Sequence, residues 1–245
     1  MSQVVVVVVT GGAGGIGAPI CRALAEDGIE IVVADLAEAA GKALADEIVK
    51  DGGEAIFQKV DVGDKASVGQ MVQQALARYS RIDFLINGAG VISRASVLEM
   101  AEEDWDRVLR INLKGTFLCS QAVARHMTER RSGRIVCVAS GRGVAGQPRG
   151  AHYAASKAGV IAFVKSLAVE LAPQNVLVNA IAPGATDTPM SRAGSTEEEW
   201  KMREAVPPLM GGLTTKEEIV GLVRYLLSEP AKHITGQTFF LRTPK

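Results

Sequence analysis

Residues 4–17 read VVVVVVTGGAGGIG and establish the architecture of the whole chain. Six consecutive valines predict a strand buried on both faces over Val4–Val9, and a helix is expected next over Gly15–Asp27. Glycines between a strand and a helix let the backbone approach a pyrophosphate, which then lies at the free N–H groups of the helix N-terminus. The stretch therefore predicts a dinucleotide site contacted by Gly11, Gly15, Ile16 and Gly17.

A carboxylate after the second predicted strand indicates which dinucleotide would bind. This strand covers Ile29–Ala34 and is followed by Asp35 and Leu36. Asp35 is placed to accept hydrogen bonds from the adenosine ribose, and its charge would repel a 2′-phosphate. No Arg or Lys occupies the neighbouring positions. The sequence therefore favours NAD over NADP, although an Asp that only caps the next helix would give the same pattern.

Composition and charge limit what else the chain could be. It has 245 residues, 47% of them hydrophobic, and its 27 basic and 27 acidic side chains balance. This balance argues against a protein that holds nucleic acid through its phosphates. The spacing of the cysteines and histidines predicts neither a disulfide framework nor a metal site, and no apolar run is long enough to cross a bilayer. We expect a cytoplasmic protein that uses no metal and binds neither membrane nor nucleic acid.

Strands and helices alternate along the chain. This pattern is typical of a doubly wound parallel α/β sheet, the Rossmann fold, with about seven strands in a single domain over residues 1–245. Residues 183–214 are rich in Gly, Pro and Thr, and we expect a lid around residues 185–213 that contains a helix over Thr196–Glu204. The other predicted strands are Glu54–Lys59, Ile82–Ile86, Arg134–Ala139, Val176–Ile181 and Thr238–Leu241, and the other predicted helices are Ala37–Lys50, Lys65–Tyr79, Glu103–Arg130, Tyr153–Leu171 and Lys216–Leu227.

A phenol and an ammonium group are predicted on one helix face. Tyr153 and Lys157 are four residues apart, and neighbours at this spacing share a face. A nearby cation lowers the pKa of a tyrosine, which makes Tyr153 a candidate proton donor and acceptor. Ser140 follows the fifth predicted strand, at the sheet edge where site residues collect in open α/β folds.

These motifs together resemble the short-chain dehydrogenase/reductase family over nearly the whole chain. The family's TGxxxGxG pattern is present as residues 10–17, and its Tyr-x-x-x-Lys as Tyr153 and Lys157. Its Asn-Asn-Ala-Gly element appears as residues 87–90, NGAG, and its helix asparagine as Asn112. Its Pro-Gly element appears as residues 183–184 and is followed by two threonines.

The resemblance implies an oxidoreductase that interconverts a secondary alcohol and a ketone. Tyr153 would exchange the proton with the substrate oxygen, and Ser140 would hydrogen-bond the same oxygen. Lys157 would lower the tyrosine pKa and hold the nicotinamide ribose, and Asn112 would keep a water that links Lys157 to solvent. Hydride transfer belongs to the cofactor NAD(H). The resemblance also assigns cofactor contacts to Asp61 and Val62 at the adenine, to Asn87, Ala89 and Gly90, and to Pro183, Gly184, Thr186 and Thr188. Asn87 could instead be purely structural and brace adjacent strands.

Two departures from the family pattern concern the central strands and the assembly. Gly88 lacks the side-chain amide that the family often uses to brace those strands, and the usual Asp-Gly-Gly near the end is replaced by LRTPK, residues 241–245. In many relatives this tail packs at a subunit interface. Relatives commonly form tetramers, and both long helices predicted here are apolar on more than one face. We therefore expect a homotetramer.

Two other functions remain open. A 3-oxoacyl-[acyl-carrier-protein] reductase would share every motif above, and Arg130 and Arg131 could dock an acidic carrier, although basic residues also complement a helix dipole. Such reductases usually use NADP, which Asp35 opposes. A non-catalytic dinucleotide-binding protein could have the same fold, but it would not need the complete catalytic set. The favoured interpretation is an NAD-dependent enzyme acting on a small-molecule alcohol or ketone.

Four arginines suggest a charge for the substrate. Arg94, Arg142, Arg149 and Arg192 lie one each in the four segments that form the pocket wall in the family. The guanidinium group suits carboxylate or phosphate, so these residues are candidate substrate contacts. Acidic side chains in the lid, including Asp187, argue the other way.

Overall fold

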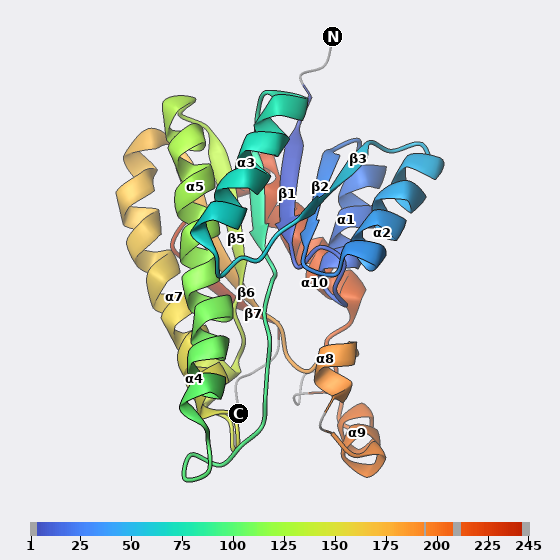
Figure 1. The fold of residues 1–245 in the computed structure, drawn as a ribbon, viewed down its shortest axis with the longest axis vertical. Coiled ribbons are helices and arrows are strands. Elements are labelled where there is room, and N and C mark those ends of the chain that lie inside the picture. Colours follow the sequence, from blue (N-terminus) through green and yellow to red (C-terminus); the bar gives the residue numbers. More distant parts are fainter. Residues whose placement is uncertain (1–3, 194, 208–211, 242–245) are drawn as a thin grey trace.

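The computed structural model describes residues 4–193, 195–207 and 212–241, and its core is a sheet of seven parallel strands (Figure 1). The order β3-β2-β1-β4-β5-β6-β7 confirms the predicted doubly wound fold. The chain runs outward from β1 to β3 and then returns to β4 on the other side of β1, and ligands of such sheets bind at the carboxyl ends of the strands near this reversal between β1 and β4. The strands are β1 Val6–Thr10, β2 Glu30–Asp35, β3 Ala55–Lys59, β4 Phe84–Asn87, β5 Gly133–Val138, β6 Val176–Ala182 and β7 Thr238–Phe240.

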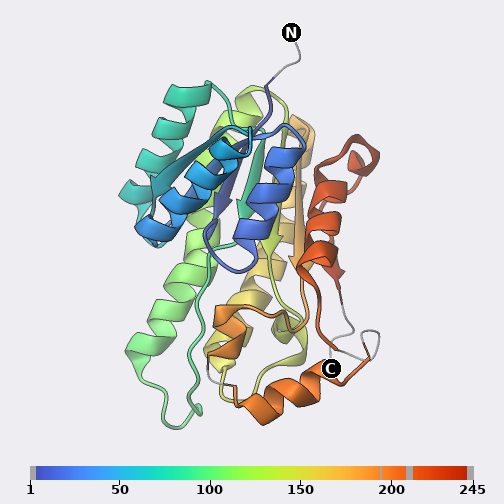
Figure 2. The same cartoon turned by 90° about the vertical axis from the view of Figure 1, so that its right-hand side faces the viewer.

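The valine run of β1 separates two hydrophobic cores. Val6 and Val8 belong to the core formed with α3, α5 and α7, and Val7 and Val9 to the core formed with α1, α2 and α10. Successive side chains of a strand point to opposite faces, so an all-valine strand can fill both layers at once. Figure 2 shows the two helical layers on either side of the sheet. The helices are α1 Gly17–Glu26, α2 Glu38–Lys50, α3 Lys65–Tyr79, α5 Gly115–Glu129, α7 Ala151–Leu171 and α10 Lys216–Leu227.

The helix predicted over Glu103–Arg130 is interrupted. It consists of α4 (Glu102–Leu109), a π-helical turn (Arg110–Lys114) and α5. The prediction of one regular helix was wrong because the apolar pattern continues through the turn without a Gly or Pro that would mark it. The side chain of Thr116 donates to the backbone carbonyl of Asn112 at 2.7 Å inside this turn. Such π-turns are frequent at functional sites.

The lid segment lies beyond the carboxyl ends of the strands (Figures 1 and 2). It carries α8 (Pro189–Arg192), which the sequence did not predict, and α9 (Glu197–Glu204), which it did. Thr188 caps α8 through its side chain, and Thr196 and Glu199 form a capping box at α9. Residues 194 and 208–211 of the predicted lid and residues 242–245 of the unusual tail lie outside the described part of the chain.

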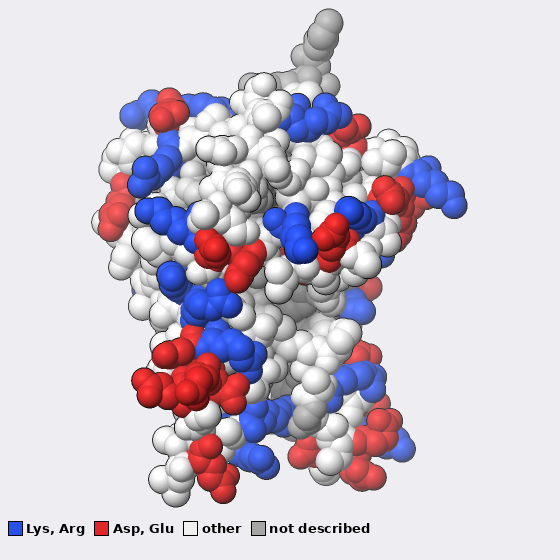
Figure 3. All heavy atoms as spheres, viewed as in Figure 1, with Lys and Arg blue, Asp and Glu red and all other residues white. Residues whose placement is uncertain are grey.

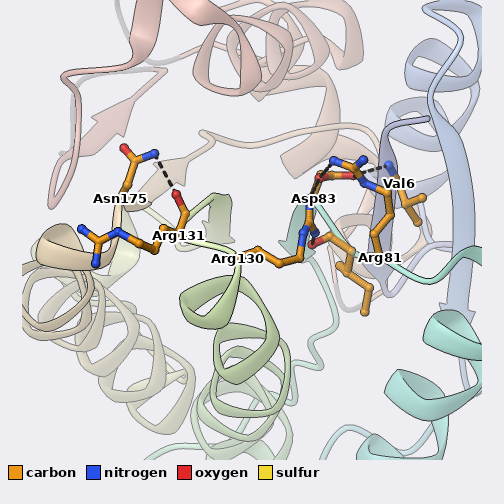
Figure 4. Close-up of polar contacts among 7 residues, drawn as sticks. Val6, Arg81, Asp83, Arg130, Arg131 and Asn175 are labelled. Carbon is orange, nitrogen blue, oxygen red and sulfur yellow. Dashed lines mark hydrogen bonds and ion pairs between the residues drawn. The ribbon is translucent and has the colours of Figure 1, made fainter. Parts of the chain in front are cut away.

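At the amino edge of the sheet, the buried carboxylate of Asp83 forms ion pairs with Arg81 and Arg130 (Figure 4). Asp83 accepts hydrogen bonds from Arg81 at 2.6 and 2.8 Å, from Arg130 at 2.7 Å and from the backbone N–H of Val6 at 2.9 Å. The neighbouring Arg131 donates to the carbonyl of Pro173 at 2.9 Å. The two arginines considered for carrier docking are therefore bound within the chain, at the sheet edge opposite to the predicted site.

The charged side chains are otherwise mixed over the surface. Figure 3 shows Lys and Arg interspersed with Asp and Glu on the viewed face, and a hollow in the lower half of the molecule. No helix of the described residues is long and apolar enough to cross a membrane.

Candidate active site

A cavity of about 370 Å³ lies at the carboxyl ends of the central strands. It extends from the glycine-rich turn past the ends of β2 and β4 to the start of α7. Its position at the reversal of strand order is the expected place for a dinucleotide. The predicted cofactor contacts that line it are Gly11, Gly15, Ile16, Gly17, Asp35, Leu36, Asp61, Val62, Ala89, Gly90, Tyr153, Lys157, Pro183, Gly184, Thr186 and Thr188.

The glycine-rich turn is shaped to admit a diphosphate. Gly11 has a φ of +66°, and a Cβ added there would lie 2.7 Å from the backbone nitrogen of Ala89. A Cβ on Gly15 would lie 2.7 Å from Thr188. The helix α1 begins after Ile16 without a side-chain cap and without an acidic residue in its first turn. The positive end of its dipole therefore fits an anionic cofactor group.

Asp35 supplies a negative charge at the adenosine end of this cavity. Its carboxylate oxygens accept one backbone N–H each, from Ala13 at 3.0 Å and from Ala37 at 2.9 Å. Each oxygen keeps a further lone pair for a ribose hydroxyl. The described cations that line the cavity are Lys157 and Arg110, and Arg110 is paired with Asp61 at 2.9 Å. A carboxylate at this position would repel a ribose 2′-phosphate.

Asn87 is the predicted cofactor contact that does not line the cavity. Its side-chain nitrogen donates to Ser120 at 2.9 Å and to the sulfur of Cys137 at 3.4 Å. It thereby joins β4 to α5 and β5, and it acts as a brace between the central strands. This is the structural role that the sequence left open for Asn87 beside a cofactor contact.

The predicted catalytic side chains come together at the end of β5. Ser140 follows β5, and Tyr153 and Lys157 project from the first two turns of α7. Ser140 and Tyr153 line both the 370 Å³ cavity and a second one next to it, whereas Lys157 lines only the first. The ammonium of Lys157 donates to the carbonyl of Val138 at 2.7 Å and lies 5.8 Å from the centre of the Tyr153 ring.

Burial shifts the pKa values of both groups. Burial raises the pKa of Tyr153, and a hydrogen bond with Ser140 and the charge of Arg142 act in the opposite direction. Burial lowers the pKa of Lys157 to about 8. Arg142 is thus the cation that opposes the rise in the Tyr153 pKa, whereas the sequence predicted this role for Lys157.

Asn112 lies in the π-helical turn and is fully buried. Its side-chain oxygen accepts the N–H of Val91 at 2.8 Å, and its nitrogen donates to the carbonyl of Val91 at 3.0 Å and to Ser156 at 3.1 Å. The side chain therefore joins the segment after β4 to α7. The water expected at Asn112 stays a prediction.

The second cavity has a volume of about 350 Å³ and an arginine-rich wall. Arg94 and Arg142 line it as predicted. Arg149 does not line it, and Arg192 is instead paired with Asp187 at 2.6 Å. Arg203, which the sequence did not single out, also lines it. Arg203 lies on α9, a polar helix whose sequence gives no sign of which face turns toward a site.

Comparison with known proteins establishes the family. The profile described as short chain dehydrogenase matches residues 5–199. The chain belongs to the short-chain dehydrogenase family.

Named relatives of this short-chain dehydrogenase act on acyl thioesters. It is 41% identical to the 3-oxoacyl-[acyl-carrier-protein] reductase of Synechocystis sp., over 96% of this chain and 94% of the relative. It is 39% identical to the acetoacetyl-CoA reductase of an Acinetobacter species, over 97% and 96% of the two chains. A crystal structure of a short-chain type dehydrogenase/reductase from Mycobacterium marinum has a TM-score of 0.90 at 33% identity, over 96% of this chain and 93% of the other. This short-chain dehydrogenase therefore shares its fold and its length with these enzymes.

Proposed function

We propose that the chain is an NAD(H)-dependent reductase of 3-oxoacyl thioesters, which converts the 3-oxo group to a secondary alcohol. The observation that carries the proposal is that Ser140 and Tyr153 line both cavities, so a substrate in the second cavity meets them beside the cofactor cavity. The sequence favoured a free alcohol or ketone. The names of the relatives support the thioester class, which was the alternative interpretation.

The side chains of the site divide the work of ketone reduction. Ser140 and Tyr153 donate hydrogen bonds to the ketone oxygen and stabilise the charge that develops there. Tyr153 gives its proton to that oxygen, and a bound nicotinamide dinucleotide supplies the hydride to the carbon. Lys157, with a pKa of about 8, is positively charged at neutral pH, and this charge would stabilise the phenolate that Tyr153 becomes when it gives up its proton.

The choice of NAD over NADP rests on Asp35, whose charge disfavours a phosphate on the adenosine ribose.

We also propose a homotetramer, because α5 and α7 leave Phe117 and Val169 exposed by 40% and 77%. Light scattering that gives the mass of a monomer would contradict this assembly.

The three cysteines are buried and free, which supports a reducing compartment such as the cytoplasm.

The substrate class is tested by NADH oxidation with purified protein. Acetoacetyl-CoA and acetoacetyl-pantetheine represent the thioesters, and cyclohexanone and 2-butanone represent free ketones. We expect the thioesters to have a kcat/KM at least tenfold above that of the ketones. A preference for the free ketones would contradict the thioester proposal and would favour an enzyme that acts on small-molecule alcohols and ketones.

A further inference from the structure

The arginine-rich wall of the 350 Å³ cavity carries a charge that ketone reduction does not use. We propose that Arg94 and Arg203, bridged by Ser195, form a subsite for an anionic group of the substrate. The inference rests on the proposed function, because it adds a substrate feature to the same site. The shared chemistry of the ligand is a carboxylate or phosphate carried by the molecule whose ketone is reduced.

One neutral hydroxyl holds the two guanidinium groups together. Ser195 Oγ accepts a hydrogen bond from Arg94 at 3.2 Å and from Arg203 at 3.3 Å, and it donates to the carbonyl of Ser191 at 3.2 Å. The bonded nitrogens are thus less than about 7 Å apart. Two like charges at this separation repel each other, so an anion between them is favoured.

The pair lacks a carboxylate partner within the part of the chain that the structure describes. No described Asp or Glu lies within 4 Å of Arg94, Arg142 or Arg203, whereas Arg192 on the same lid is paired with Asp187. The Nε of Arg94 is buried and without a hydrogen-bond partner. Buried donors are normally satisfied, so the described chain leaves the guanidinium of Arg94, a residue that lines the cavity, short of one acceptor.

The two arginines come from different parts of the molecule. The backbone around Arg94 is anchored to the body, because Asn112 binds Val91 and His152 contacts Ser93 Oγ at 2.7 Å. Arg203 is on the lid helix α9 and lies 5.7 Å from the ring centre of Trp200. An anion between the two guanidinium groups would therefore connect the lid to the body.

The anion belongs to the substrate because the subsite shares its cavity with the reacting groups. Arg94, Arg142 and Arg203 line the same 350 Å³ volume as Ser140 and Tyr153. A cavity of this size holds one small molecule. The anionic group is either a carboxylate in the acyl part or a phosphate in the thioester arm, and the guanidinium fork accepts both.

Two substrate pairs separate these sources. The first compares the monoethyl ester of 3-oxoadipic acid with the same ester in which the carboxylate is a carboxamide. The second compares acetoacetyl-phosphopantetheine with acetoacetyl-pantetheine. We expect the wild-type enzyme to prefer the anionic member of one pair by at least tenfold in kcat/KM, mainly through KM. Arg94→Gln and Arg203→Gln should each lower this ratio at least fivefold, whereas Lys201→Gln, which removes a charge from the exposed face of the same helix, should leave it unchanged.

A binding measurement tests the subsite without turnover. In a Trp105→Phe background Trp200 is the remaining tryptophan, and titration with malonate should change its emission saturably. Arg94→Gln should weaken this binding at least tenfold. If neither substrate pair shows a preference and malonate gives no saturable change, the subsite is wrong, even when neutral acetoacetyl-pantetheine is reduced. If malonate binds as expected and no thioester is reduced, the proposed function is wrong and the subsite stands.

Discussion

The side chain of Asn112 pairs with both backbone polar groups of Val91, accepting its N–H at 2.8 Å and donating to its carbonyl at 3.0 Å. The pair fixes the segment between the cofactor cavity and Arg94. It depends on the π-helical turn, which presents the amide of Asn112 to this segment while the neighbouring residues continue the helix.

Asn112→Ala should destabilise the protein and reduce its activity together. The substitution leaves the N–H and C=O of Val91 without their partner, which costs about 2–4 kcal/mol for two poorly solvated backbone groups. Denaturant unfolding should show this loss, and kcat should fall because the wall of the site loosens. Ser166→Ala on an exposed part of α7 serves as the control. A fully active and fully stable Asn112→Ala protein would show that the hydrogen bonds between Asn112 and Val91 contribute neither to stability nor to the geometry of the site.

Tyr153→Phe should abolish turnover while cofactor binding survives. The substitution keeps the ring and deletes the proton donor, and general acid catalysis is worth about 10²–10⁴ in rate. Steady-state kinetics gives kcat, and NADH fluorescence titration gives the dissociation constant. The role in proton transfer would be refuted by turnover within a factor of three of wild type.

Asp35→Ala should relax the preference for NADH over NADPH. The carboxylate at the ribose end repels a 2′-phosphate, and its removal leaves a neutral surface. We expect wild-type kcat/KM to be at least tenfold higher with NADH and the variant ratio to approach one. Glu38→Gln, on the exposed first turn of α2, controls for charge alone. Equal efficiency of the wild type with both cofactors would contradict the assignment.

Lys157 should make the cofactor-free protein more stable as the pH rises from 8 to 10.5. Burial disfavours its charged form and lowers its pKa to about 8, against 10.5 for an ordinary lysine. Between these values the unfolded chain binds a proton that the folded chain has lost, so stability increases with pH, by an amount on the order of 3 kcal/mol. Lys157→Met should lack this increase. Parallel pH profiles of unfolding for the two proteins would contradict the shift.

Asp83→Asn should lower stability without changing the chemistry of the site. Burial raises the pKa of Asp83, but the hydrogen bonds from Arg81 and Arg130 outweigh it, so the net pKa is lowered. The stabilisation is present above an unfolded value of about 4 and is lost as the pH falls through the lower folded value. Near neutral pH the substitution should cost about 3 kcal/mol in chemical unfolding, because two arginines lose their charge partner. A cost that persists unchanged below pH 3 would argue against the ion pairs.

The fold and most of the residues that line the cofactor cavity could be predicted from the sequence, because local patterns encode them. A valine strand followed by glycines places the pyrophosphate site, and the bounds of α3 and α10 follow from their apolar periodicity. Asp35 was identifiable because it is the last residue of β2 and therefore lies at the carboxyl edge of the sheet. Tyr153 and Lys157 were identifiable from a spacing that fixes one helix face, and Ser140 from its place after the fifth predicted strand.

Contacts between distant segments had to be read from the fold. The sequence left Asn87 open between a cofactor contact and a brace of the strands, and its hydrogen bonds to Ser120 and Cys137 had to be read from the structure, since a side chain's partner depends on which helix packs over the strand. The pairing of Asn112 in the π-turn has no sequence signal, because its partner Val91 is twenty-one positions away. The subsite of Arg94 and Arg203 depends on where the lid lies over the body. Local propensity sets the elements, whereas the orientation of a polar helix such as α9 is set by its packing against the rest of the molecule.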